Sequence, residues 1–135
     1  MNGSFLARVE SVMNNSSAAT VRSPAALLGQ WDLVICECED GYSSSIYEYD
    51  NDIGVRDQIQ RLLDAPELQQ YAELGEFRRE VDNIDARFRA ILRPVVEVKA
   101  DSPYWWRRGV LASAGREYAD DVEALYGVHI DVPQS

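Results

Sequence analysis

The stretch LGEFRREVDNIDARFRAI, residues 74–91, decides the fold. Its large apolar residues recur at spacings of three, four, three, four and three. They are Leu74, Phe77, Val81, Ile84, Phe88 and Ile91. This spacing places all of them on one face of an α-helix. We therefore predict a long helix, ended by Pro94, at the centre of a helical bundle. A dimer seam is the alternative, but the repeat is shorter than that of a sustained coiled coil.

Further helices are expected before this stretch. The first covers residues 4–13 and is followed by a loop over residues 14–17. The second covers residues 24–39, because Ser23 is a good N-cap and Pro24 suits the first helical turn. After a loop over residues 40–45, Asp52 can cap a third helix. The side chains that would then face inward are Ile53, Arg56, Ile59, Leu62 and Leu63.

The last part of the chain mixes helix and strand signals. Residues 95–99 resemble a short strand or an extended linker. A last helix begins either at Ser102 or only after Gly109, and Gly127 is its expected C-terminal cap. Residues 128–132 alternate apolar and polar side chains, as a half-buried strand does. The predicted architecture is one mainly α domain, residues 1–135, a bundle of about five helices. A small two-stranded β element, 95–99 with 128–132, is an optional addition.

The composition is that of a soluble globular domain. The 135 residues are 46% hydrophobic and 27% charged, and their formal net charge is −10. Such acidity argues against general binding of nucleic acid and against docking on anionic membranes. The N-terminus lacks the pattern of a secretory signal, and no apolar run is long enough to cross a membrane. We therefore expect a cytoplasmic protein without direct contacts to nucleic acid or membrane.

The chain contains two cysteines, Cys36 and Cys38. A bridge between residues so close in sequence would be strained, so we expect free thiols in a reducing compartment. A zinc site would need four ligands, and beyond these thiols the sequence offers His129 and carboxylates. We predict neither a metal nor a cofactor.

The negative charge is concentrated in residues 36–52, which include six acidic residues and no basic one. The acids are Glu37, Glu39, Asp40, Glu48, Asp50 and Asp52, and they are interspersed with Tyr42, Tyr47 and Tyr49. Tyrosine provides a large contact area at protein interfaces, and carboxylates accelerate association with a basic partner. This segment is therefore the predicted partner-binding site. The alternative is a solvated loop whose tyrosines cover helix ends.

The string Tyr104-Trp105-Trp106-Arg107-Arg108 is the most unusual short motif. Trp and Arg are enriched in binding hot spots, so Trp105, Trp106, Arg107 and Arg108 form a secondary binding candidate. Aromatic and arginine side chains also suit stacking on single-stranded nucleic acid, but the surrounding charge is negative. We favour a structural interpretation, in which the tryptophans close one end of the bundle and the arginines pair with nearby acids.

No sequence motif supports catalysis. The chain has a single histidine, and it contains neither a Gly-x-Ser-x-Gly elbow nor a Gly-rich phosphate loop. For paired carboxylates such as Asp82 and Asp85, we expect ion pairs with arginines on the same helix. We predict no catalytic residue and no enzymatic activity.

The function that fits these observations is binding and inhibition of a basic protein partner. A bacterial immunity protein or antitoxin has this size and acidity, and its partner would be a toxin or an enzyme acting on nucleic acid. One alternative is an enzyme or small-ligand-binding protein whose pocket is lined by Trp31, Trp105 or Trp106. Another is a homodimeric scaffold built on the 74–91 seam. The sequence leaves monomer and homodimer open.

Overall fold

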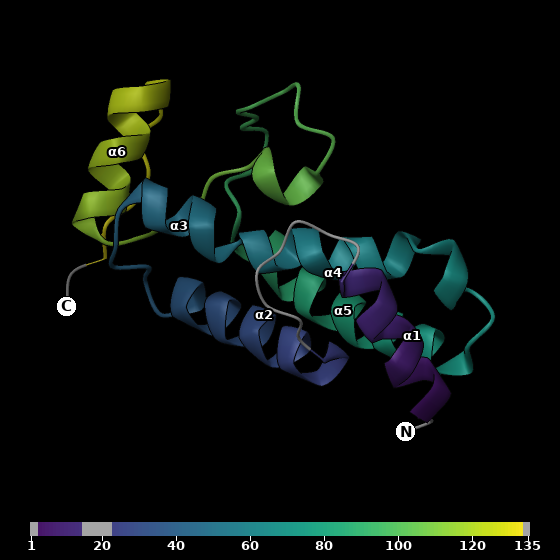
Figure 1. Cartoon of the computed structure of the whole chain (residues 1–135). Coiled ribbons are helices and arrows are strands. Elements are labelled where there is room, and N and C mark those ends of the chain that lie inside the picture. The colour runs from purple at the N-terminus through teal and green to yellow at the C-terminus, as the bar shows by residue number, and fades with distance from the viewer. Residues whose placement is uncertain (1–2, 15–22, 134–135) are drawn as a thin grey trace.

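The computed structural model describes residues 3–14 and 23–133, and these residues are mainly α-helical, as predicted (Figure 1). The helices are α1 (Gly3–Asn14), α2 (Pro24–Glu39), α3 (Ile46–Asp52), α4 (Gly54–Asp64), α5 (Ala72–Ile91) and α6 (Arg116–Tyr126). Two 3-10 turns, Pro66–Leu68 and Trp105–Arg107, lie between them. The loop predicted over residues 14–17 falls, from residue 15 onward, outside the described residues.

Helices α2, α4 and α5 form the centre of the bundle. Both α4 and α5 pack on α2. Helix α2 is parallel to α5 and antiparallel to α4 (Figure 1). Two contacts show that α4 and α5 are antiparallel. Arg56 near the start of α4 pairs with Asp85, whereas the Leu63 carbonyl near its end accepts a hydrogen bond from Arg78. Helix α1 covers α4 and the Pro66–Leu68 turn, and α3 packs on α6.

The predicted central helix is confirmed as α5. Leu74, Phe77, Val81, Ile84 and Phe88 are buried on its inner face, while Ile91 is half-buried at its end. These side chains contribute to one continuous core together with those of the other helices. The seam is thus covered by residues of the same chain, which removes the basis for a dimer built on it.

The start of α2 also follows the prediction. Ser23 is its N-cap, Pro24 is its first residue, and Ser23 Oγ accepts a hydrogen bond of 3.1 Å from the Ala26 amide. At the other end of the chain, Gly127 caps α6 with φ of 67°, a left-handed conformation that glycine adopts without strain.

The predicted cap at Asp52 is wrong, because Asp52 is the last residue of α3. This short helix was not expected from the sequence. It begins after Ser45, whose Oγ accepts a hydrogen bond of 3.2 Å from the Glu48 amide. Ile53 then joins α3 to α4 with helical backbone angles and no side-chain cap. The inward face predicted for the following helix is confirmed. Its buried residues are Val55, Arg56, Ile59, Leu62 and Leu63, and Ile53 just before it is buried as well.

The predicted pairing of residues 95–99 with 128–132 does not form. Val95 and Lys99 have φ of 63° and 48°, and these left-handed residues turn the backbone away from an extended course. Isolated bridges join Leu92 to Leu111 and Ser113 to Asp131 instead. Residues 128–132 still alternate in burial, with Ile130 in the core.

The last helix begins after Gly109, as the second of the two predicted starts allowed, but seven residues beyond it. Residues 102–115 form the 3-10 turn Trp105–Arg107 and an irregular connection before α6 begins at Arg116. Leu111 is therefore buried in the connection, and Leu125 of α6 is half exposed. None of the helices in the described part of the chain is long and apolar enough to cross a membrane.

Candidate functional site: the acidic end of the bundle

The fold brings two acidic segments of the chain to one end of the bundle. Helix α3 packs on α6, and the Asp121 carboxylate accepts a hydrogen bond of 3.0 Å from the Ile46 amide at the first turn of α3 (Figure 1). The Gly115 amide donates a second bond, 2.7 Å long, to the Tyr42 carbonyl. Residues 36–52 and 116–126 together contain ten acidic residues and one arginine. We call these two segments the acidic end.

Several carboxylates of the acidic end face solvent without a basic neighbour. Glu37, Asp40 and Glu48 are exposed, and none of the three forms an ion pair with another described residue. On α6, Glu117 is exposed as well. The exposed carboxylates of Asp120 and Glu123 lie 4.0 Å from Arg116 and 3.6 Å from His129, respectively. Exposed pairs at such distances are weak in water. The surface potential at this end is therefore negative.

Three other predicted site acids are engaged within the protein. Glu39 binds Arg87 of α5, and this hydrogen bond lowers the pKa of the Glu39 carboxyl. Asp50 forms an ion pair of 2.8 Å with Lys99, the single lysine of the chain. Asp52 accepts a hydrogen bond of 2.6 Å from the Tyr42 hydroxyl. These contacts attach α2 and α3 to the rest of the bundle, so the three carboxylates hold the surface in place.

Two of the three predicted contact tyrosines belong to the core. Tyr42 and Tyr49 are buried, and each packs edge-on against the other and against Tyr118 of α6. Burial raises the pKa of all three phenols. Tyr47 is different, because 66% of its surface is exposed. The aromatic contact area of the acidic end is thus that of Tyr47, while the other two tyrosines cover helix ends as the alternative interpretation held.

The buried hydroxyls of this cluster are not equally satisfied. The Tyr118 hydroxyl accepts a hydrogen bond of 3.1 Å from the Leu111 amide. Tyr49 Oη is buried without a hydrogen bond of standard geometry, although burial and the neighbouring Tyr118 raise its pKa. The Tyr49 hydroxyl is therefore the least well satisfied polar group of the cluster.

A cavity opens at the acidic end between the last residues of α2 and α5. Its volume is about 470 Å³, and Glu39, Asp40, Ile91 and Pro133 are among the residues that line it. Helix C-termini carry a partial negative charge, and two of them end at this cavity. It can therefore receive a cationic side chain, with Ile91 and Pro133 contacting the aliphatic part of that side chain.

Both cysteines are free. Burial, followed by nearby carboxylates, raises the pKa of the Cys38 thiol to about 12, so it is protonated and unreactive at neutral pH. Cys36 Sγ lies 3.3 Å from the Arg87 guanidinium. Among residues 3–14 and 23–133, no three His, Cys, Asp or Glu side chains are grouped closely enough to hold a metal ion.

The secondary candidate, Trp105 to Arg108, forms part of the bundle rather than an open surface. Trp106 is buried, its indole Nε1 donates a hydrogen bond of 2.7 Å to Asp57, and its ring covers the Arg56 guanidinium at 4.3 Å. Arg107 binds the same Asp57 carboxylate at 2.7 Å. Trp106 and Arg107 therefore have structural contacts, as we favoured from the sequence: the tryptophan is buried in the bundle and the arginine pairs with a nearby acid.

Trp105 and Arg108 are half-buried beside this pair. The Trp105 ring packs against Phe88 at 5.9 Å, and the guanidinium of Arg89 lies 3.9 Å from its centre. Arg108 contributes its backbone, because its carbonyl accepts a hydrogen bond from Val98. The tryptophans line neither the cavity beside Glu39 nor the two further surface cavities, which lie beside Phe77 and beside Gln58. The predicted aromatic-lined ligand pocket thus has no counterpart among these cavities.

Sequence analysis missed the contribution of α6 to the acidic end. Four acids, Glu117, Asp120, Asp121 and Glu123, lie within seven residues of one another. Their local density was a usable signal, but their position beside α3 depends on tertiary packing.

Comparison of the chain with protein-family models, curated proteins and solved structures finds no match.

Proposed function

We propose that this chain is a small protein-binding inhibitor that docks a basic partner at its acidic end. One observation carries the proposal: α6 packs on α3, so that two acidic segments form one negatively charged surface. A surface of one sign attracts a partner of the opposite sign and raises the rate of association. The role is binding rather than catalysis, and it requires no metal or cofactor.

The proposed contact residues follow from exposure. Glu37, Asp40 and Glu48 provide the charge, and Tyr47 provides an exposed aromatic ring. The cavity beside Glu39 and Asp40 accepts an arginine or lysine side chain of the partner. In this proposal a toxin or an enzyme acting on nucleic acid is the partner, because such proteins present basic active sites. The proposed setting is the bacterial cytoplasm, where the chain acts like an immunity protein or antitoxin.

The test is kinetic and uses a basic enzyme acting on nucleic acid as the partner. The variant Glu37→Lys/Asp40→Lys/Glu48→Lys reverses three charges of the acidic end. The matched control, Glu67→Lys/Asp82→Lys/Glu97→Lys, makes the same change at exposed acids elsewhere. We expect the first variant to slow association at low salt about tenfold or more, and the control to slow it far less.

Stopped-flow mixing over a range of salt concentrations measures both association rates. In the wild type, salt should slow association, and this dependence should be largely lost in the first variant. Equal association rates for the two triple variants would refute the proposed site.

A further inference from the structure

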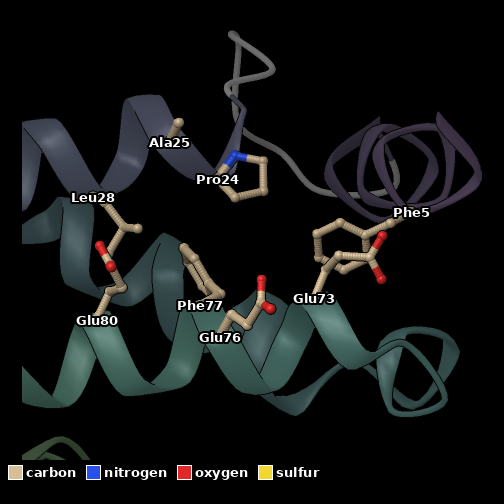
Figure 2. Close-up of a pocket in the computed structure, with 8 residues that line it drawn as sticks. All are labelled: Phe5, Pro24, Ala25, Leu28, Glu73, Glu76, Phe77 and Glu80. Carbon is tan, nitrogen blue, oxygen red and sulfur yellow. The ribbon is translucent and has the colours of Figure 1, made fainter. Parts of the chain in front are cut away.

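A groove lies at the end of the α2–α5 pair away from the acidic end, and α1 closes one side of it (Figure 2). Its volume is about 270 Å³. The apolar lining comes from Phe5 of α1, from Pro24, Ala25 and Leu28 of α2, and from Phe77 of α5. This volume is at the small end of the range for ligand pockets, and it suits one or two apolar side chains better than a larger small molecule.

One side of the groove is acidic. Glu73, Glu76 and Glu80 of α5 line it, and Figure 2 shows all three side chains directed toward the gap between the helices. Neither Glu76 nor Glu80 forms an ion pair with another described residue. Glu73 and Glu80 are seven residues apart, or about 10 Å along a helix. Cations one turn apart on a second helix lying alongside α5 would match this spacing.

Helix α2 provides no basic side chain that could pair with Glu76 or Glu80. Its sequence, PAALLGQWDLVICECE, contains no basic residue. Farther along the α2–α5 pair, Arg87 of α5 binds Asp32 and Glu39 of α2, so the carboxylates there are matched within the chain. At the groove the arrangement differs, because carboxylates of α5 face the uncharged residues Ala25 and Leu28. An apolar lining beside Glu76 and Glu80, which form no ion pair within the described part of the chain, favours a ligand that is both apolar and cationic.

We propose that this groove binds a cationic amphipathic helix of a partner protein. One or two large apolar side chains of that helix would enter the groove beside Leu28 and Phe77. Lysine or arginine residues on its flank would pair with Glu76 and Glu80. This is the helix-in-groove form of recognition, in which apolar anchors recur at helical spacing. The site is separate from the acidic end, and neither proposal depends on the other.

The probe for this groove is an 18-residue peptide of leucine and lysine, arranged so that the leucines share one helical face. A peptide of the same composition in scrambled order is the first control, and a leucine–glutamate peptide in the original order is the second. Calorimetric titration measures affinity, and amide NMR shifts of the labelled protein locate the peptide. We expect the amphipathic cationic peptide to bind about tenfold or more tightly than either control, with shifts at Ala25, Leu28 and Phe77.

Two pairs of variants test the lining and the charge separately. Leu28→Gln places a polar amide in the groove, whereas Leu33→Gln makes the same change at an exposed position of α2 outside it. Glu76→Gln/Glu80→Gln removes the two carboxylates, and Glu67→Gln/Asp82→Asn removes two exposed carboxylates elsewhere. We expect the groove variants to weaken binding about five- to tenfold and the controls to change it less than twofold. Circular dichroism and thermal melts establish that every variant is folded.

Three results would overturn the proposal. The first is equal binding of the ordered and scrambled cationic peptides, which would indicate attraction by net charge alone. The second is loss of peptide binding in Glu37→Lys/Asp40→Lys/Glu48→Lys with no loss in the groove variants, which would assign the peptide to the acidic end. The third is a dimer in sedimentation that Leu28→Gln dissociates, without any peptide binding, since a second copy of this chain would then occupy the groove.

Discussion

Arg56 and Asp85 form a bidentate ion pair inside the bundle. Arg56 Nε and Nη2 lie 3.0 and 2.9 Å from the two carboxylate oxygens of Asp85, and both side chains are 4% exposed. Trp31 Nε1 donates a further hydrogen bond of 3.0 Å to the same carboxylate, and Gln60 accepts one of 2.9 Å from Arg56 Nη1. The Trp106 ring covers the guanidinium. The pair therefore connects α2, α4, α5 and the 3-10 turn Trp105–Arg107. The expected pairing of Asp85 with an arginine on its own helix is wrong, because Arg56 belongs to α4.

Asp85→Asn should lower the free energy of unfolding by about 3 kcal/mol, because Arg56 would keep its charge in the interior without a counter-charge. Urea denaturation measures the change. Asp82→Asn, at an exposed position of the same helix, is the control and should shift stability by less than about 0.5 kcal/mol. The double variant Arg56→Met/Asp85→Leu should recover most of the loss, since apolar replacements of a buried pair are often tolerated. A loss in the double variant as large as in Asp85→Asn would contradict this account.

Replacing tyrosine by phenylalanine should affect stability differently at two positions of the tyrosine cluster. Tyr49→Phe should leave stability unchanged or raise it by up to about 1 kcal/mol, because it removes a buried hydroxyl that has no hydrogen bond of standard geometry. Tyr42→Phe should lower stability by about 1 kcal/mol, because it removes the donor to Asp52. Thermal and urea melts of the two variants give the comparison. A larger loss for Tyr49→Phe than for Tyr42→Phe would rule out this assignment of hydrogen bonds.

Gly115 is required by a close approach of two backbones. A Cβ at this position would lie 2.8 Å from the Tyr42 carbonyl oxygen, to which the Gly115 amide donates. Gly115→Ala should therefore cost about 2 kcal/mol. Gly29→Ala is the matched control, because a Cβ there meets no atom within 4 Å and Gly29 lies inside α2. That variant should gain about 1 kcal/mol from helix propensity. Equal melting temperatures of the two variants would contradict the close approach.

Alkaline pH should destabilise the fold, beginning near pH 9. Burial raises the pKa of Cys38 to about 12 and raises the pKa of Tyr49 above its ordinary value. Below pH 9 both groups are protonated in the folded and the unfolded chain, so their contribution to stability is complete. Above it the unfolded chain releases protons that the folded chain retains, and stability falls by about 1.4 kcal/mol per pH unit for each such proton.

Urea denaturation between pH 8 and pH 11 measures this slope. Cys38→Ala should make the decline shallower, beginning near pH 9, and Tyr49→Phe should do the same near pH 10. Tyr47→Phe changes an exposed tyrosine and serves as the control. A pH dependence identical in wild type and Cys38→Ala would exclude the buried thiol as a cause.

The sequence predicted the long regular elements well and the short ones poorly. Helix α5 has six apolar positions in one repeat, so its period was visible without any tertiary information. Helix α3 has seven residues and buries two of them, Ile46 and Tyr49, which is too little to show a period. The strand-like segments failed for another reason. Their alternation is real in residues 128–132, but the turned backbone at Val95 and Lys99 removes the expected partner.

The candidate site was predictable in its charge and less so in its geometry. Clustering of carboxylates in residues 36–52 is visible in the sequence, whereas the burial of Tyr42 and Tyr49 is not, because tyrosine occurs both in cores and at interfaces. The side chains that contact the tryptophan–arginine string could not be predicted from the sequence either. Asp57 lies 49 residues before Trp106, and no local pattern indicates that they meet.

The parallel course of α2 and α5 affects how this protein is made. The Trp31 indole binds a carboxylate 54 residues later in the chain, and Arg56 is covered by a ring from residue 106. A nascent chain that has left the ribosome only as far as α4 therefore lacks Asp85, and the apolar face of α2 lacks α5, against which it packs in the finished bundle. Folding is completed only near the end of translation, and until then the apolar face of α2 stays exposed.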